Sequence, residues 1–180
     1  MAVREILIHP DEVLQQVAKP VLFPLSAEVE QLITDMADTM YDAPGVGLAA
    51  PQVGALLRLA ITDTVWRDKE VRHDGAKAGE QRELKVWINP EITWASNEME
   101  EWEEGCLSVP DTYGDVSRPA AIRLRWFDQQ GVVHEQEFRG FQAVALQHEF
   151  DHLDGKLFID YLSPLKRKMI TKKMKKLYKS

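Results

Sequence analysis

Two histidines four residues apart, with a glutamate directly after the first, form the pattern His148-Glu149-Phe150-Asp151-His152. If this stretch is helical, His148 and His152 lie one turn apart on one face, so both imidazoles can reach one metal ion. Glu149 then lies beside that ion and can exchange protons with water. The pattern predicts a hydrolytic metal site. Two helix histidines that only hydrogen-bond to their surroundings are the structural alternative.

The segment around this pattern predicts a helix over roughly residues 141–153, since its first half contains good helix formers and Gly155 follows as a stop signal. Counting back from His148 by threes and fours gives the metal-facing stripe, which should line the floor beside the ion. That stripe carries Phe141, Val144 and Ala145. A second apolar face carries Leu146, Phe150 and Leu153. A helix that is apolar on two faces is a buried core helix.

Two further stretches have the composition of segments that approach a ligand closely. Residues 45–54 contain three glycines and several small residues, and Gln52 adds an amide donor near the end. A tight structural turn explains this composition equally well. Cys106 follows Gly105, whose conformational freedom can aim the thiol inward and leave the N–H of Leu107 pointing at whatever Cys106 contacts. A lone cysteine is more often a small buried hydrophobe.

The rest of the sequence predicts the helices and strands that must position these residues. Apolar residues at helical spacing predict a helix that Ser26 caps and that ends before Asp42. Strands are expected over residues 56–62, 84–89, 92–94, 121–127 and 132–138, with Pro90 closing the second. Residues 68–83 are expected to form an exposed loop. Most of the glutamates in residues 98–104 are expected to form an acidic edge exposed to solvent.

Composition favours one domain over residues 1–180, since 44% of the residues are hydrophobic and can fill a core. No apolar run approaches 18 residues and no leader precedes the first helix, so we expect a cytoplasmic protein without a membrane segment. The single cysteine agrees with a reducing compartment. Residues 163–180 carry eight Lys or Arg and no acid, which leaves 14 basic against 29 acidic residues elsewhere. A basic helix with a narrow apolar stripe is expected over residues 165–177.

Three stretches occur together in one order: GVGLAAPQ at 45–52, EGCLS at 104–108 and QHEFDHLDG at 147–155. This set resembles peptide deformylases, which remove the formyl group from the N-terminal methionine of nascent bacterial and organellar proteins. The resemblance implies an α+β fold with antiparallel β-sheets wrapped around a central metal-binding helix, here with a C-terminal basic helix. It also implies Fe²⁺ as the usual metal, with Zn²⁺, Ni²⁺ or Co²⁺ able to replace it.

The same resemblance implies a role for each site residue. Cys106, His148 and His152 become metal ligands with water at the fourth position, and Glu149 becomes the general acid and base. A metal lowers the pKa of bound water, which would then attack the formyl carbon. The amide of Gln52 and the N–H of Leu107 would stabilise the developing oxyanion. The expected substrate-binding residues are Val46, Gly47, Trp102, Gly105, Phe141, Val144 and Ala145.

The chain departs from many relatives at one position. Seven residues after the ligand cysteine, where those relatives carry a peptide-contacting Arg, this chain has Tyr113. Arg118 lies further on, and whether it substitutes stays open. The expected partners are N-formylmethionyl peptides and, through the basic C-terminal helix, the ribosome. A solvated helix end is the alternative explanation of that charge.

Two other functions compete with deformylation. A metallopeptidase can use the same His-Glu-x-x-His helix. A non-enzymatic, metal-stabilised module that binds the ribosome would need a closed metal site with a fourth protein ligand. The chain has no second cysteine, and His9, His73 and His134 are poorly placed for this purpose.

Overall fold

The computed structural model describes residues 2–66 and 82–178. In chain order these residues form η1 (Glu12–Gln15), α1 (Ala27–Asp42), β1 (Gly47–Ala49), η2 (Ala50–Val53), β2 (Leu59–Thr62), β3 (Lys85–Ala95), β4 (Met99–Cys106), β5 (Val109–Pro119), β6 (Ala121–Phe127), β7 (Val133–Arg139), α2 (Gly140–Leu153), η3 (Phe158–Tyr161) and α3 (Pro164–Leu177). Most of the loop expected over residues 68–83, with His73, lies outside the described residues.

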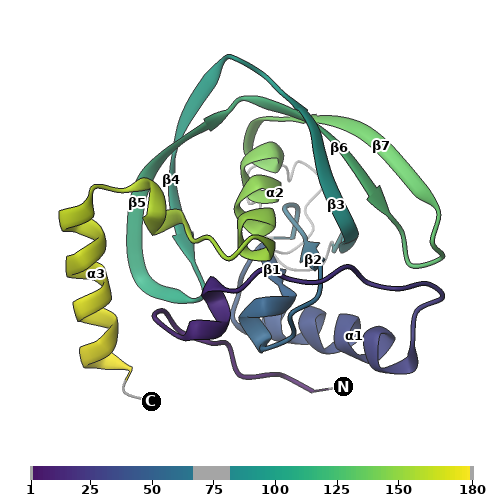
Figure 1. Cartoon of the computed structure of the whole chain (residues 1–180), viewed down its shortest axis with the longest axis horizontal. Helices are drawn as coiled ribbons and strands as arrows, with labels where there is room; N and C mark the ends of the chain where they lie inside the picture. Colours follow the sequence, from purple (N-terminus) through teal and green to yellow (C-terminus); the bar gives the residue numbers. More distant parts are fainter. Residues whose placement is uncertain (1, 67–81, 179–180) are drawn as a thin grey trace, which may run out of the picture.

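Two antiparallel sheets surround α2. The larger sheet has five strands in the order β1-β2-β3-β6-β7, and the smaller is the β4–β5 hairpin. Figure 1 shows the strands arching around α2, with α1 below and α3 at one side of the molecule beside β5. The predicted α+β fold, with sheets wrapped around a central helix and a helix at the C-terminal end, is confirmed.

The helices begin and end close to where the sequence predicts. The hydroxyl of Ser26 accepts a hydrogen bond from the N–H of Val29, and α1 continues through Asp42, one residue further than predicted. In α2 every residue from Ala143 to Phe150 is buried, as expected for a helix that is apolar on two faces. Among its residues, α3 buries only Met174.

The two faces of α2 have different partners. Leu146, Phe150 and Leu153 pack in one core cluster with Trp87 and Phe138 of the five-stranded sheet. The opposite face, which carries the histidines, is directed toward the β4–β5 hairpin. The large sheet therefore fixes the position of the helix, and the β4–β5 hairpin supplies the residues that lie opposite the histidines.

One strand prediction is wrong. Residues 84–89 and 92–94 do not form two strands separated by Pro90, because β3 runs without a break from Lys85 to Ala95. The ladder to β6 shifts register between Ile88 and Glu91, and Asn89 has a positive φ of 48°. A proline is tolerated inside a strand at such a bulge, since its missing N–H is not needed there. The side chain of Asn89 bonds the N–H and C=O of Val21 and so holds the bulge.

None of the helices described here is long and apolar enough to span a bilayer. The acidic edge expected over residues 98–104 is Glu98 and the first part of β4, and its glutamates are exposed or half-buried except for Glu104, which is buried.

Candidate metal centre and active site

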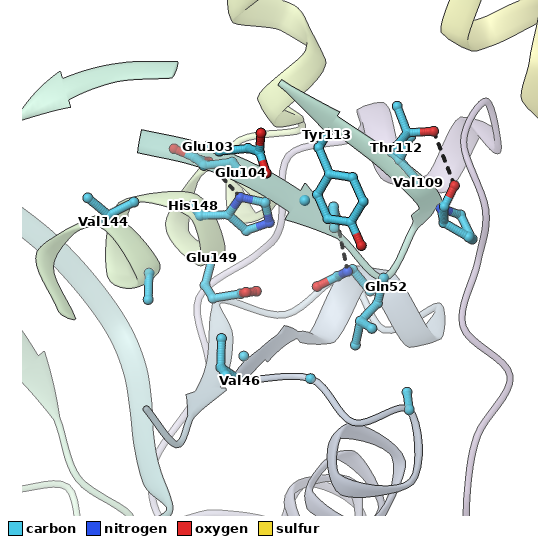
Figure 2. Close-up of a pocket in the computed structure, with 18 of the residues that line it drawn as sticks. Val46, Gln52, Glu103, Glu104, Val109, Thr112, Tyr113, Val144, His148 and Glu149 are labelled. Atoms are coloured by element: carbon cyan, nitrogen blue, oxygen red, sulfur yellow. Dashed lines mark hydrogen bonds and ion pairs between the residues drawn. The ribbon is translucent and has the colours of Figure 1, made fainter. Parts of the chain in front are cut away.

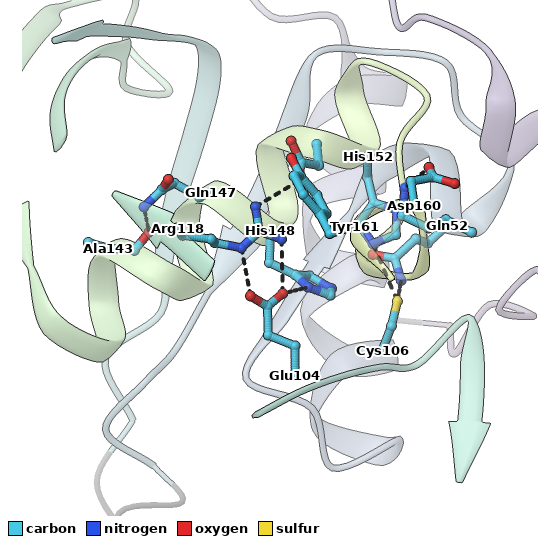
Figure 3. Close-up of polar contacts among 12 residues, drawn as sticks. Gln52, Glu104, Cys106, Arg118, Ala143, Gln147, His148, His152, Asp160 and Tyr161 are labelled. Carbon is cyan, nitrogen blue, oxygen red and sulfur yellow. Dashed lines mark hydrogen bonds and ion pairs between the residues drawn. The ribbon is translucent and has the colours of Figure 1, made fainter. Parts of the chain in front are cut away.

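Three side chains that could ligate a metal ion meet between α2 and the end of β4. One donor atom each from Cys106, His148 and His152 lies within 4.8 Å of the other two. The Sγ of Cys106 is 3.4 Å from the Nε2 of His152 (Figure 3). One thiolate and two imidazoles suit a first-row divalent metal ion and leave a coordination position open. The donor set therefore fits a catalytic metal ion, as the sequence predicts.

A buried ionic network orients the first of these histidines. The Nδ1 of His148 lies 2.9 Å from the Oε1 of Glu104, so it donates to that carboxylate and leaves Nε2 free for a metal. Arg118 donates from Nε and Nη2 to both oxygens of Glu104, at 2.6 and 2.9 Å, and from Nη1 to Asp151 at 2.8 Å. Burial acts to raise the pKa of Glu104, but the hydrogen bonds from His148 and Arg118 outweigh it and hold that pKa below its usual value.

The network extends to the surface through Tyr161 of η3. Its hydroxyl donates to the carboxylate of Asp151 at 2.9 Å, and its ring faces the guanidinium of Arg118 at 4.8 Å. Sequence reasoning missed Glu104 and Arg118 as site residues. The signal for Glu104 was its place in the EGCLS stretch, directly before Gly105, but four exposed or half-buried glutamates just before it concealed it.

Glu149 faces the same space from the next position on α2. Its Oε2 is buried and has no hydrogen-bond partner among the described residues. A buried carboxylate oxygen without a partner in the protein is suited to a ligand or water in the site. Burial raises the pKa of Glu149 to about 7, which favours proton exchange near neutral pH. The backbone of Gly47 passes so close that a Cβ added there would lie 2.5 Å from the Oε1 of Glu149.

The amide of Gln52 is locked in one orientation. Its Oε1 accepts from the N–H of Ala49 at 2.9 Å, which directs its Nε2 to the Oγ of Ser108 at 3.1 Å and toward the Sγ of Cys106 at 3.6 Å. Because the oxygen is already used, the amide presents only donor hydrogens to the centre. The residues 45–54 therefore do bring an amide donor to the metal-ligating residues.

A pocket of about 670 Å³ opens in front of these groups. Figure 2 shows Val46, Gln52, His148 and Glu149 around it. Every residue that the sequence analysis expects to bind substrate lines the pocket: Val46, Gly47, Trp102, Gly105, Phe141, Val144 and Ala145. Leu107 lines it as well. Phe141 reaches the pocket from the edge of α2, where its ring lies 5.9 Å from that of Trp102.

The structure shows where the residues lie whose roles the sequence left undecided. Tyr113 lines the pocket with its ring against Gly105, and its side chain is 66% exposed. Arg118 is buried in the ionic network and so does not take the place of a peptide-contacting arginine. His9 is buried against Thr171 of α3, and His134 pairs with Asp128 on the surface. Neither of these histidines belongs to the Cys106–His148–His152 cluster.

Comparison with known proteins identifies what this site resembles. The family model described as polypeptide deformylase matches residues 3–168. A peptide deformylase from Novosphingobium aromaticivorans is 50% identical over 188 residues, covering 100% of both chains.

Two solved structures have the same fold. The peptide deformylase of Legionella pneumophila has a TM-score of 0.84 at 46% identity and covers 97% of this chain and 95% of its own. The peptide deformylase of Ehrlichia chaffeensis in complex with actinonin has a TM-score of 0.87 at 33% identity over 100% of both chains. With the metal-ligating cluster and the pocket in place, these matches show that the chain belongs to the polypeptide deformylase family.

Proposed function

We propose that this deformylase removes the formyl group from the N-terminal methionine of nascent proteins with a divalent metal ion held by Cys106, His148 and His152. The observation that carries the proposal is the convergence of these three donors within 4.8 Å beside a pocket that Cys106, His148 and Glu149 line. A cation bound there would acidify water and polarise the formyl carbonyl. Fe²⁺ is the proposed natural metal, with Zn²⁺, Ni²⁺ or Co²⁺ as replacements.

Each remaining step belongs to a residue of the chain. Glu149 accepts a proton from the attacking water and returns it to the departing amine, so that formate and a free N-terminus result. The Gln52 amide and the N–H of Leu107 donate to the formyl oxygen as it gains negative charge. One such donor contributes about 2.7–4 kcal/mol to transition-state stabilisation.

The apolar part of the pocket supplies the preference for methionine. Val46 comes from the loop before β1, Trp102 from β4, and Phe141, Val144 and Ala145 from α2. Gly47 and Gly105 also line the pocket, and their lack of a side chain leaves room for Glu149 and for the ring of Tyr113. Because one methylene group in such a pocket is worth about 1–3 kcal/mol, the preference among apolar first residues should be graded.

We test the function with two peptides that differ only in the blocking group, formyl-Met-Ala-Ser and acetyl-Met-Ala-Ser. The expected result is formate release from the first, with Met-Ala-Ser as the other product by mass spectrometry, and no reaction of the second. Cleavage of a peptide bond instead would favour the metallopeptidase alternative. Actinonin, with which the Ehrlichia relative was solved in complex, is added in the control reaction as a ligand that should compete with the peptide. Metal analysis of protein purified without oxygen identifies the ion.

The partner proposal concerns α3. Its lysines and Arg167 are seven of the eight basic residues of residues 163–180, while Leu165, Met169 and Leu177 are exposed along it. Met174 packs with Val109, Val116 and Phe158, which supports one domain that includes this helix. We propose that α3 binds the ribosome in the cytoplasm through phosphate contacts. Co-sedimentation with ribosomes that weakens with added salt supports this; co-sedimentation that is absent, or indifferent to salt and to Lys172→Glu, contradicts it.

A further inference from the structure

The backbone of Gly45 and Val46, which lines the pocket, is held from behind by the segment that follows β2. The indole Nε1–H of Trp66 donates to the carbonyl of Gly45 at 2.9 Å. The N–H of Asp63 donates to the carbonyl of Val46 at 2.8 Å. Two consecutive pocket residues therefore take their position from residues that do not line the pocket.

Trp66 is itself fixed on two sides. Its backbone N–H donates to the Oδ1 of Asp63 at 3.1 Å. Its ring meets the ring of Tyr41 edge-on, with 5.2 Å between the centroids and 85° between the planes. The hydroxyl of Tyr41 donates to the Oδ2 of Asp63 at 2.6 Å, and Asp63 is buried. An anchored side chain of this kind can hold a loop, because displacing the indole breaks contacts beyond its own hydrogen bond.

Gly45 also has no spare room at its Cα. A Cβ added there would lie 2.7 Å from the Cδ1 of Leu107. Gly45 is thus hydrogen-bonded to Trp66 through its carbonyl and packed against Leu107 at its Cα. Any shift of Gly45 changes the width of the pocket between Val46 and Leu107, both of which line it.

We propose that Trp66 is a positioning residue that, through the carbonyl of Gly45, sets the width of the pocket and so the selectivity for the first side chain of the substrate. This inference rests on the proposed function, in which Val46 and Leu107 face the substrate. Trp66 touches neither the pocket nor the metal-ligating residues, so it acts on substrate binding and leaves the chemical step unchanged.

The direct test is Trp66→Phe, which keeps an aromatic ring against Tyr41 and removes the N–H donor. Losing one such bond shifts the balance between held and displaced loop positions by roughly two- to tenfold, and the apparent affinity falls with the fraction of loops that are held. We expect KM for formyl-Met-Ala-Ser to rise, by at most that factor, with kcat unchanged. We also expect kcat/KM for formyl-Phe-Ala-Ser to fall less than that for formyl-Met-Ala-Ser.

Trp94→Phe is the matched control, because Trp94 is 43% exposed on β3 and does not line the pocket. It should leave KM and the ratio of the two substrates unchanged. If Trp66→Phe fails to fold, benzothienylalanine at position 66 keeps the shape of indole and replaces only the N–H. Wild-type KM and wild-type substrate ratio in either folded variant would overturn the inference. Absence of formate release from the wild-type protein would overturn the proposed function instead.

Discussion

Gly47→Ala tests whether Glu149 has the catalytic position that we propose. The added Cβ would lie 2.5 Å from the Oε1 of Glu149 and 2.9 Å from its Cδ and Cγ, whereas ordinary contact begins at 3.4 Å. The carboxylate must therefore retreat by about 0.9 Å, and it has little room because Glu149 is buried. A displacement near 1 Å of a reacting group costs about 10²-fold in rate. We expect kcat to fall by about that factor.

Metal content should not change, because Gly47 lies against Glu149 and not against the three metal-ligating residues. Overpacking should also lower the free energy of unfolding by about 1–3 kcal/mol. Gly54→Ala is the control for stability alone. Gly54 has a φ of 85° and open space around it, so alanine there costs roughly 1–2 kcal/mol of backbone strain without touching the pocket. Its kcat should remain that of the wild type.

A double-mutant cycle separates this explanation from a general disturbance of the loop. In a Glu149→Ala background the methyl group of Ala at position 47 meets no carboxylate, so the stability cost of Gly47→Ala should largely disappear. Formate release gives kcat, urea unfolding gives stability, and elemental analysis gives bound metal. The reasoning is refuted if Gly47→Ala keeps wild-type kcat, or if its stability cost is the same with and without the Glu149 side chain.

The remaining predictions concern the donors and the ionic network. Gln52→Leu keeps the buried volume but removes the amide, so kcat should fall about 10²–10³-fold in the formate assay; a smaller loss would remove the oxyanion role. Arg118→Met leaves the carboxylate of Glu104 buried without its cation, which should cost about 3–5 kcal/mol in urea unfolding; a cost near zero would contradict this role of Arg118. Because the folded pKa of Glu104 lies below the ordinary 4.5, its contribution to stability is present above that pH and is lost as the pH falls through the folded value. Glu104→Gln should flatten this acid-side loss of the unfolding midpoint. Cys106→Ala should leave the chain folded with less than one bound metal ion per chain; full metal content would exclude the thiolate as a ligand.

Local periodicity explains why the helix of the site could be predicted from the sequence. The spacing of His148 and His152, the apolar residues before them and the glycine after them all belong to one run of the chain, and α2 ends at the predicted residue. The same geometry placed Val144 and Ala145 at the pocket without further information. Periodicity could not predict that Cys106 lies beside the two histidines, because Cys106 is in β4 and the histidines are in α2. That expectation came from the resemblance of three separate stretches.

The errors have a common physical cause, since they occur where a non-local partner overrides local preference. Pro90 reads as a strand end, yet β3 continues because the bulge at Asn89 is tied to Val21, 68 residues away. Strand β5 was not predicted at all, because Pro110, Gly114 and Pro119 interrupt any alternation. It forms because its whole length pairs with β4. In the sequence Glu104 cannot be distinguished from its exposed neighbours, because its burial depends on the ion pair with Arg118, 14 residues away.

The ionic network is better explained as an alignment device than as a source of stability. Buried ion pairs gain little over well-packed apolar residues, because desolvation offsets the attraction between the charges. This network joins α2 to both strands of the hairpin, through Asp151 of α2, Glu104 of β4 and Arg118 of β5. Only one alignment of the hairpin on the helix satisfies all three charges at once. That alignment also brings Cys106, two residues after Glu104, to His152. A hairpin shifted along the helix would leave a charge buried without its partner. Because an unpaired buried charge is strongly destabilising, the shifted arrangements are disfavoured and Cys106 stays beside the two histidines.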